Sequence, residues 1–185
     1  GINYEITTEA ESDANNPEYT GAQMKLDNNG LLHTMYFFSD GNTSTGTGRG
    51  IKIRKGLWGT GGSGEEITIS MQDIEDARNS GFIATYIYSY DLAFNSQNEL
   101  YLAINTTSNE FFIMKYDETT GLDLLGYDYR NDDVISPSDG SQYLGLEIDG
   151  ADNLDVGAIG RNQFMRYHKF SKTGEILESA WSRYD

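Results

Sequence analysis

Three segments of this chain repeat one pattern of apolar strands and polar turns, and this repetition limits the fold more than any other feature of the sequence. In each copy an apolar strand leads to a turn of Asn, Asp and Gly, a second apolar strand follows, and a third strand carries a lysine. The copies occupy residues 24–55, 92–116 and 146–170. Self-similarity at a period of tens of residues is typical of a repeat architecture, so we expect the fold to consist of similar units.

The strands and turns of the repeats predict the fold class. Runs of β-branched and aromatic residues that end at Gly, Asn or Asp are typical of β-strands joined by hairpins. Further turns at 117–121 and 171–174 each lead to an additional strand, so one copy would form a four-stranded unit. The sequence therefore predicts an all-β fold, a propeller-like array of about three four-stranded antiparallel blades. A β-sandwich, in which the same strands pack as two sheets, is the alternative.

Composition divides the chain into an arm and one repeat domain. Residues 1–22 are mainly polar and acidic, and we interpret them as an N-terminal arm or first strand. Residues 23–185 are predicted to be a single repeat domain. Its repeats are expected at about 23–64, 65–130 and 131–185.

One short helix is expected to interrupt the strands. Ser70 and Asp73 have the spacing of a capping box, Ile74 and Ala77 would share one helical face, and Gly81 favours a stop. The Gly-rich segment 59–64 just before it predicts a flexible hinge. The helix is therefore expected to have one or two turns.

The charge of the chain excludes several classes of partner. Twenty-nine acidic and thirteen basic residues give a formal net charge of −16. Nucleic acids and anionic membranes are bound through clustered lysine and arginine, so neither is an expected partner. No apolar run approaches the roughly 20 residues that span a bilayer, which predicts no membrane insertion. The absence of cysteine excludes disulfides and thiolate metal ligands.

The first repeat carries a motif that is known from a family of proteins. Residues 26–30 read Leu-Asp-Asn-Asn-Gly, His33 and Tyr36 follow, and residues 51–55 read Ile-Lys-Ile-Arg-Lys. This pattern resembles the repeats of sialidase-like (BNR-type) β-propellers, with about three degenerate copies in the chain. The resemblance implies a propeller fold and, through it, a carbohydrate-active function.

The number of repeats makes neighbouring molecules important. Propellers close with about four to eight blades, whereas this chain has three repeats. An open arc leaves strand edges and sheet faces unpaired, which favours aggregation. We therefore expect the open edges to be covered by self-association, by protein neighbours in an assembly, or by the remainder of a longer chain. Glycans are a further candidate partner.

No catalytic residues are predicted. The family resemblance implies that a sialidase would need three arginines for the substrate carboxylate, a Tyr/Glu nucleophile pair and an acidic proton donor. The chain lacks the Ser-x-Asp-x-Gly-x-Thr-Trp motif of such repeats, and it has neither HExxH nor the spacing of a Ser/His/Asp triad. His33 is interpreted as a hydrogen-bonded structural residue rather than a base or metal ligand. The pattern favours a protein that is not an enzyme.

The densest acidic turn supplies the candidate metal ligands Asp149, Asp152 and Asp155. Carboxylate oxygens are hard ligands, so the ion expected there is calcium, and no other cofactor is predicted. The spacing differs from that of an EF-hand loop. Asp, Asn and Gly also occur in hairpins because they tolerate positive φ and cap their own turns, so a purely structural role is the alternative.

Aromatic side chains are the candidate ligand-binding residues. Sugar rings can stack on aromatic faces, and tyrosines alternate along two predicted strands. The candidates are Tyr86, Tyr88, Tyr90, Tyr127 and Tyr129. The alternative is that these rings form one half-buried strand face, since the amphipathic ring of tyrosine suits core edges as well as interfaces.

These observations favour a non-catalytic extracellular or virion-surface binding or assembly module built from propeller-like repeats. Two alternatives stay open: a carbohydrate-active, sialidase-like propeller fragment or subunit, and a purely structural protein of an ordered assembly. An abundance of Tyr, Asn and Gly with only two prolines is typical of an exported all-β protein. The expected location is therefore extracellular, at a cell surface or on a virion.

Overall fold

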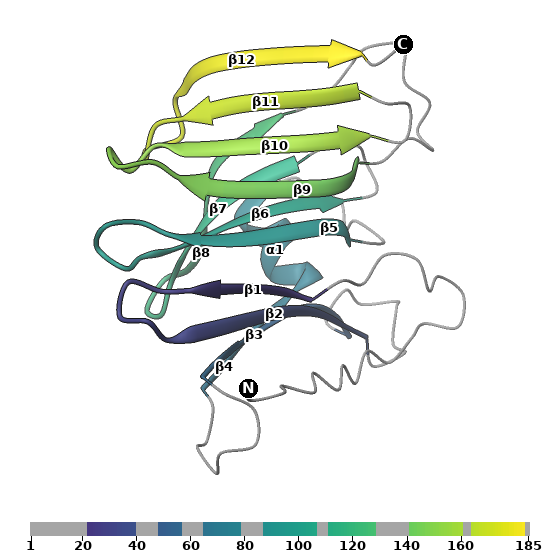
Figure 1. Cartoon of the computed structure of the whole chain (residues 1–185). Coiled ribbons are helices and arrows are strands. Elements are labelled where there is room, and N and C mark those ends of the chain that lie inside the picture. The colour runs from purple at the N-terminus through teal and green to yellow at the C-terminus, as the bar shows by residue number, and fades with distance from the viewer. Residues whose placement is uncertain are drawn as a thin grey trace, which may run out of the picture.

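The described part of the chain forms three four-stranded antiparallel β-sheets and one helix (Figure 1). This computed structural model describes residues 22–39, 48–56, 65–78, 87–106, 111–128, 141–160 and 164–183. The first blade comprises β1 (Gln23–Leu26), β2 (Leu32–Ser39), β3 (Arg49–Lys55) and β4 (Glu66–Ser70). The second blade comprises β5 (Ile87–Phe94), β6 (Leu100–Thr106), β7 (Phe111–Asp117) and β8 (Gly121–Asp128). The third blade comprises β9 (Ser141–Ile148), β10 (Leu154–Gly160), β11 (Phe164–Phe170) and β12 (Ile176–Arg183).

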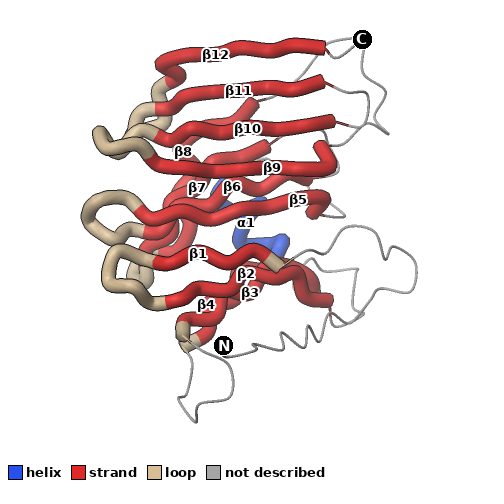
Figure 2. The backbone as a smooth tube through the Cα atoms, viewed as in Figure 1, coloured by secondary structure: helices blue, strands red, loops and turns tan. Residues whose placement is uncertain are grey.

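The blades are arranged as in a propeller. Within each blade the strands pair in chain order. The first strands, β1, β5 and β9, lie next to one another, and the other strands extend away from this row (Figures 1 and 2). Sheets that radiate from a common line of first strands are typical of propeller blades. The predicted all-β, three-bladed fold is confirmed, and its three separate sheets differ from the two packed sheets of a β-sandwich.

The first blade is longer in sequence than the repeat pattern predicts. β4 pairs with β3, for example with Ile67 opposite Ile53, so the first unit continues to Ser70 instead of ending at residue 64. The segment 59–64, expected as a hinge between repeats, instead connects β3 to β4 within one blade. That segment and residues 1–21 of the expected arm lie outside the described residues.

The predicted helix is confirmed as α1 (Met71–Arg78). Ser70 and Asp73 form the expected capping box. The Asp73 N–H donates to the Ser70 hydroxyl at 3.1 Å, and the Ser70 N–H donates to the Asp73 carboxylate at 2.7 Å. Met71 and Ile74 are buried and join the apolar core. Within the described ranges, no helix is long and apolar enough to cross a membrane.

The repeated turn is built in the same way in all three blades. Its first residue is Asp27, Asn95 or Asp149, and the side-chain Oδ1 of each accepts two backbone N–H groups of its own turn at 2.8–3.1 Å. The residue three positions later has positive φ in each case, from 61° at Asp152 to 77° at Gly30. A tight hairpin needs these two features. The Asn, Asp and Gly residues of the repeat therefore have a structural role.

Neighbouring turns also bind one another. The Asn28 N–H donates to the Asn98 Oδ1 at 2.9 Å, and one blade further on the Ser96 N–H donates to the Asp152 Oδ1 at 2.8 Å. In both cases the donor is the second residue of one turn and the acceptor is the fourth residue of the next. The repeat therefore encodes contacts between blades as well as the blades themselves.

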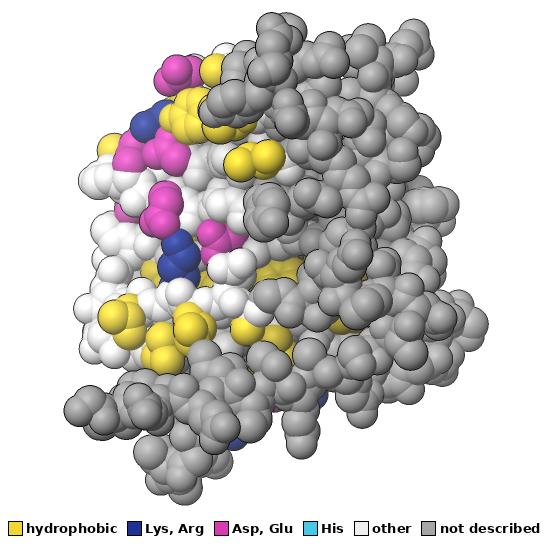
Figure 3. Space-filling model, turned by 45° about the vertical axis from the view of Figure 1, so that its right-hand side comes forward, with side chains coloured by type: hydrophobic (Ala, Val, Ile, Leu, Met, Phe, Trp, Pro, Cys, Tyr) yellow, Lys and Arg dark blue, Asp and Glu magenta, His cyan; other side chains and the backbone are white. Residues whose placement is uncertain are grey.

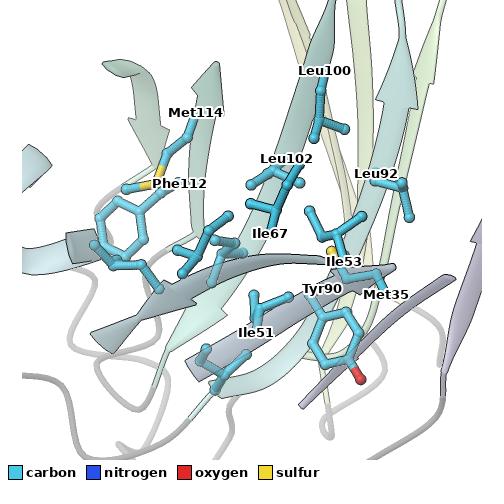
Figure 4. Packing of buried hydrophobic residues seen from close by; sticks show 14 of the residues in the cluster. Met35, Ile51, Ile53, Ile67, Tyr90, Leu92, Leu100, Leu102, Phe112 and Met114 are labelled. Atoms are coloured by element: carbon cyan, nitrogen blue, oxygen red, sulfur yellow. The ribbon is translucent and has the colours of Figure 1, made fainter. Parts of the chain in front are cut away.

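Two apolar cores hold the blades together, one at each junction. The core between the first and second blades contains Ile53, Leu102 and Phe112, each at most 1% exposed (Figure 4). The core between the second and third blades contains Ala103 and Val156, both fully buried. Successive side chains of a strand point to opposite faces, so Leu102 and Ala103 enter different cores. The second blade is thus buried on both faces.

Asp91 of β5 ties the second blade to the third. This carboxylate is buried, accepts the Leu92 N–H at 2.8 Å, and accepts the Leu146 N–H of β9 at 2.8 Å. Burial raises the pKa of Asp91, and the two N–H groups and the Lys25 ammonium at 3.9 Å counteract that effect. A buried acceptor that holds two strands of different sheets limits how those sheets can slide.

Replacement of Asp91 by alanine should destabilise the protein. Asp91→Ala leaves the N–H groups of Leu92 and Leu146 without this acceptor, which should lower the free energy of unfolding by about 2–3 kcal/mol. Urea denaturation measures this value. The control is Asp123→Ala, because Asp123 is an exposed aspartate in β8, and a change within about 0.5 kcal/mol is expected there. Equal stability of the two variants would contradict the role of Asp91.

Candidate functional site

An open cleft of ≈ 530 Å³ lies at the junction of the first and second blades. The β1–β2 turn, the start of β2, the end of β3 and the start of β4 line it from the first blade. The β5–β6 turn, the end of β7 and the β7–β8 turn line it from the second blade. Because both blades contribute side chains, the cleft exists only when the two sheets are packed together.

A histidine and an aspartate form the base of the cleft. His33 is 3% exposed, and its Nε2 lies 3.3 Å from the Asp27 Oδ2, which also accepts the Asn98 Nδ2 at 3.2 Å. Burial lowers the pKa of His33, and this outweighs the opposing effect of Asp27. Burial acts to raise the pKa of Asp27. Hydrogen bonds from the Leu31 N–H, the Asn98 amide, the His33 ring and the Asn29 N–H outweigh burial and lower this pKa. A neutral His33 therefore donates from Nε2 to an ionised Asp27.

Lysines and glutamates form the rim. The Lys55 ammonium of β3 donates to Glu65 at 3.0 Å and to Glu118 of the β7–β8 turn at 2.7 Å. Burial acts to lower the pKa of Lys55, but the bonds to Glu118 and Glu65 raise it. Lys115 pairs with Glu99 at 2.5 Å. The Lys55–Glu118 ion pair links the first blade to the second across the mouth of the cleft.

Apolar side chains form the walls. The Phe94 ring lies with its centroid 4.6 Å from that of His33, tilted by 52°. Leu31, which is 42% exposed, Leu100 and Tyr116 complete the apolar lining together with Ile67. The cleft therefore offers aromatic and aliphatic surface beside charged and amide groups, which is typical of small-molecule sites.

The charges of the lining are unbalanced. The side chains of its lysines and acids are two positive and five negative groups: Lys55, Lys115, Asp27, Glu65, Glu99, Asp117 and Glu118. An excess of carboxylates repels anionic ligands in a partly desolvated space. The cleft is therefore suited to a neutral or cationic ligand.

At the corresponding place between the second and third blades, a turn of the third blade contacts the backbone of the second. A Cβ on Gly174 of the β11–β12 turn would lie 1.8 Å from the Leu125 carbonyl oxygen of β8, and one on Gly126 would lie 2.9 Å from the Phe170 ring. Gly121, the positive-φ residue of the β7–β8 turn, has no atom within 4 Å of its Cβ position. Glycine permits close contact at one junction, whereas the ion pair of Lys55 spans an open cleft at the other.

The predicted calcium ligands do not assemble into one site. Asp149 accepts Lys169 at 2.7 Å, Asp152 accepts the Ser96 hydroxyl at 2.8 Å, and Asp155 accepts the Tyr167 hydroxyl. No group of three or more His, Asp or Glu side chains in the described part of the chain is arranged to hold a metal ion. The Lys169 ammonium also lies 3.6 Å from the Asp155 Oδ1, so a protein cation lies against both Asp149 and Asp155, whereas Asp152 binds Ser96 of the second blade. These contacts agree with the structural alternative.

The prediction that Tyr90 is a ligand-binding residue is wrong. This side chain is 3% exposed in the first core, and its hydroxyl accepts the Phe37 N–H at 3.0 Å. Burial raises the pKa of Tyr90 to about 12. Tyr88 and Tyr127 lie in β5 and β8, but their side chains fall outside the described residues, as do Tyr86 and Tyr129 entirely.

The residues that form the cleft were only partly visible in the sequence. Lys55 stands out there as the repeated lysine, and His33 is expected to be hydrogen-bonded, which its bond to Asp27 shows. Phe94, Tyr116 and Glu118 carry no signal of their own, since each resembles other strand or turn residues. Their meeting depends on the packing of two blades.

No family model and no curated protein matches the chain. Similar solved structures include a protein of unknown function from Bacteroides caccae, with 10% identity and a TM-score of 0.44, over 87% of this chain and 46% of that one. Another is a fucose lectin from Kordia zhangzhouensis in complex with methyl-fucoside, with 11% identity and a TM-score of 0.45, over 89% of this chain and 99% of that one. The chain thus spans less than half of the Bacteroides caccae protein. Neither structure, at such identities and TM-scores, assigns a function to this chain.

The buried His33 should make the stability of the protein depend on pH. Its pKa is lowered on folding, so the unfolded chain takes up a proton first when the pH falls through about 6.5, and stability is lost below that pH. His33→Phe keeps a ring beside Phe94 but cannot be protonated. The decrease in the free energy of unfolding between about pH 7 and pH 5, measured with urea, should be smaller in this variant. Equal decreases in the variant and the native protein would contradict the prediction.

Proposed function

We propose that this protein is a non-catalytic binding module that takes an uncharged carbohydrate in the cleft between its first and second blades. One observation carries the proposal: the cleft places apolar walls, with the rings of Phe94 and Tyr116, beside amide and carboxylate acceptors and two lysines. A sugar has an apolar C–H face and a rim of hydroxyl groups, so it matches both kinds of surface at once.

The charge of the cleft supports a neutral sugar over an acidic one. Lys55 already donates to Glu65 and Glu118, and Lys115 already donates to Glu99, so a ligand carboxylate would have to displace a protein carboxylate. The remaining acids of the lining would repel it. Sialosides and uronates are therefore disfavoured as ligands.

The sialidase-like alternative receives no support from the arginines that the structure describes. Such an enzyme would need several arginines around one ligand, and none of the described arginines lines the cleft. The arginines with described side chains are Arg49, Arg54, Arg78 and Arg166. Arg78, for example, pairs with Glu75 and lies 4.3 Å from the Phe112 ring centroid.

The Asp27–His33 pair supports binding rather than catalysis. The Asp27 carboxylate accepts the N–H groups of Asn29 and Leu31, the Asn98 amide and the His33 ring. A carboxylate with four donors has little basicity left for proton transfer. The pair therefore positions the β1–β2 turn at the base of the cleft.

The composition of the chain supports the extracellular, cell-surface or virion setting that we propose.

A glycan array followed by calorimetry tests the proposal. Neutral glycans should bind and sialylated ones should not. Tyr116→Leu keeps an apolar wall but removes the ring, and Glu118→Ala removes an acceptor at the rim, so each should weaken binding about tenfold.

The matched control is Glu175→Ala. Glu175 is an exposed glutamate that follows the β11–β12 turn, outside the lining of the cleft, and its loss should leave the affinity unchanged. Retention of native affinity by both cleft variants would rule out this site. Preference for sialylated glycans would contradict the charge argument.

A further inference from the structure

The first and third blades each have one face that no described blade covers. The second blade lies between them and contributes one face to each core, so the first and third blades are the two ends of an arc (Figure 1). We call their remaining sheet faces, directed away from the second blade, the two outer faces. If further blades cover these two faces, the arc of three blades can close into a ring.

The outer face of the third blade carries two glycines, several charged residues and exposed apolar residues. Strand register places Gly145 opposite Gly157, and no atom lies within 4 Å of the Cβ position of either. Ile159 and Met165 are paired on the same face and are 43% and 39% exposed. On the side of the molecule that Figure 3 presents, hydrophobic side chains reach the surface in separate groups among acidic and basic ones. The two glycines leave room for protruding side chains of another surface.

The outer face of the first blade carries apolar residues at positions that are covered elsewhere. Met24 occupies the place in its repeat that Leu92 and Leu146 occupy in theirs, and both leucines are fully buried by the preceding blade. Met24 is 46% exposed, and Leu26, two residues further along the same strand face, is 65% exposed. Exposed apolar side chains at repeat positions that are otherwise buried indicate a surface that another blade can cover.

The two outer faces have complementary charge. Register across the third blade aligns three acids and one base, Glu147, Asp155, Glu178 and Lys169. Register across the first blade places two bases and one acid on its outer face, Arg54, Lys52 and Glu66. Several of these charges are paired within the chain: Lys25 with Glu147 at 2.6 Å, Lys169 with Asp155 at 3.6 Å, and Lys52 with Glu66 at 2.9 Å. The remaining excess of negative charge on one face and of positive charge on the other favours their contact.

We propose that a second copy of this chain is the partner, with the third-blade face of each copy packed against the first-blade face of the other. Two such contacts would close a ring of six blades, which lies within the four to eight that propellers use. The contact is heterologous, since different faces meet, and closure after two copies prevents an open filament. Met24 and Leu26 of one copy would cover the glycines of the other, as Leu92 and Leu146 are covered within one chain. This inference does not depend on carbohydrate binding.

Analytical ultracentrifugation of the full chain, combined with face variants, tests the ring. The native protein should sediment as two chains. Met165→Glu on the third-blade face and Leu26→Glu on the first-blade face should each raise the dissociation constant at least about tenfold. Ile159→Glu serves as a second variant of the third-blade face, and circular dichroism confirms that each variant folds. The control is Ile176→Glu, a similarly exposed residue at the start of β12, which should remain dimeric.

Mixing the two variants distinguishes this ring from other dimers. A Met165→Glu chain and a Leu26→Glu chain together retain one native pair of faces, so the two-chain species should return on mixing. A symmetric contact of one face with itself would not be restored, because both chains of such a pair would need that face intact. A native mass other than two chains, dissociation of the Ile176→Glu control, or no recovery on mixing would overturn the proposal.

Discussion

A sheet with apolar side chains is stable only when another surface covers them, and the whole arrangement of this molecule depends on that requirement. The second blade satisfies it on both sides, because Leu102 enters the core with the first blade and Ala103 enters the core with the third. The first and third blades satisfy it on one side each. The cleft between two blades and the two outer faces are both consequences of this stacking.

Apolar burial has no direction, so polar contacts determine how the blades are aligned. Asp91 holds strands of two blades through the N–H groups of Leu92 and Leu146, and it is buried where an unpaired group would be costly. At the turns, Asn98 and Asp152 accept backbone N–H groups of the preceding blade. The same repeat positions thus supply both the tight turn and the contact that aligns one turn with the next.

The cleft arises because the two junctions are closed differently. Gly174 allows the β11–β12 turn to contact the backbone of β8 at the junction of the second and third blades. At the other junction, Lys55 reaches Glu118 of the second blade, and both residues line an open cleft together with His33 and Phe94. A side-chain ion pair thus spans the cleft at one junction, whereas a turn contacts backbone at the other.

Local features of the sequence were sufficient for most of the fold. The repeat pattern predicted three blades, the spacing of Ser70 and Asp73 predicted the start of α1, and Asp149 predicted a turn. These features depend on hydrogen bonds between residues a few positions apart and on the alternation of side chains along a strand. They can therefore be predicted from the sequence alone. β4 was assigned to the wrong repeat because its partner β3 lies beyond a Gly-rich connection and the pairing is not local.

The candidate site required the tertiary structure. The alternation of side chains along β5 does not indicate which face of the strand is buried. Tyr90 was therefore predicted as a ligand-binding residue although it lies in the core. Asp149, Asp152 and Asp155 are close in sequence, but Asp152 binds Ser96 of another blade, and Lys169 lies against the other two carboxylates. Sequence by itself determined the blades and their turns, because neighbouring residues encode them. Only the packing of one blade on another decided which side chains meet, since that depends on contacts between residues far apart in the chain.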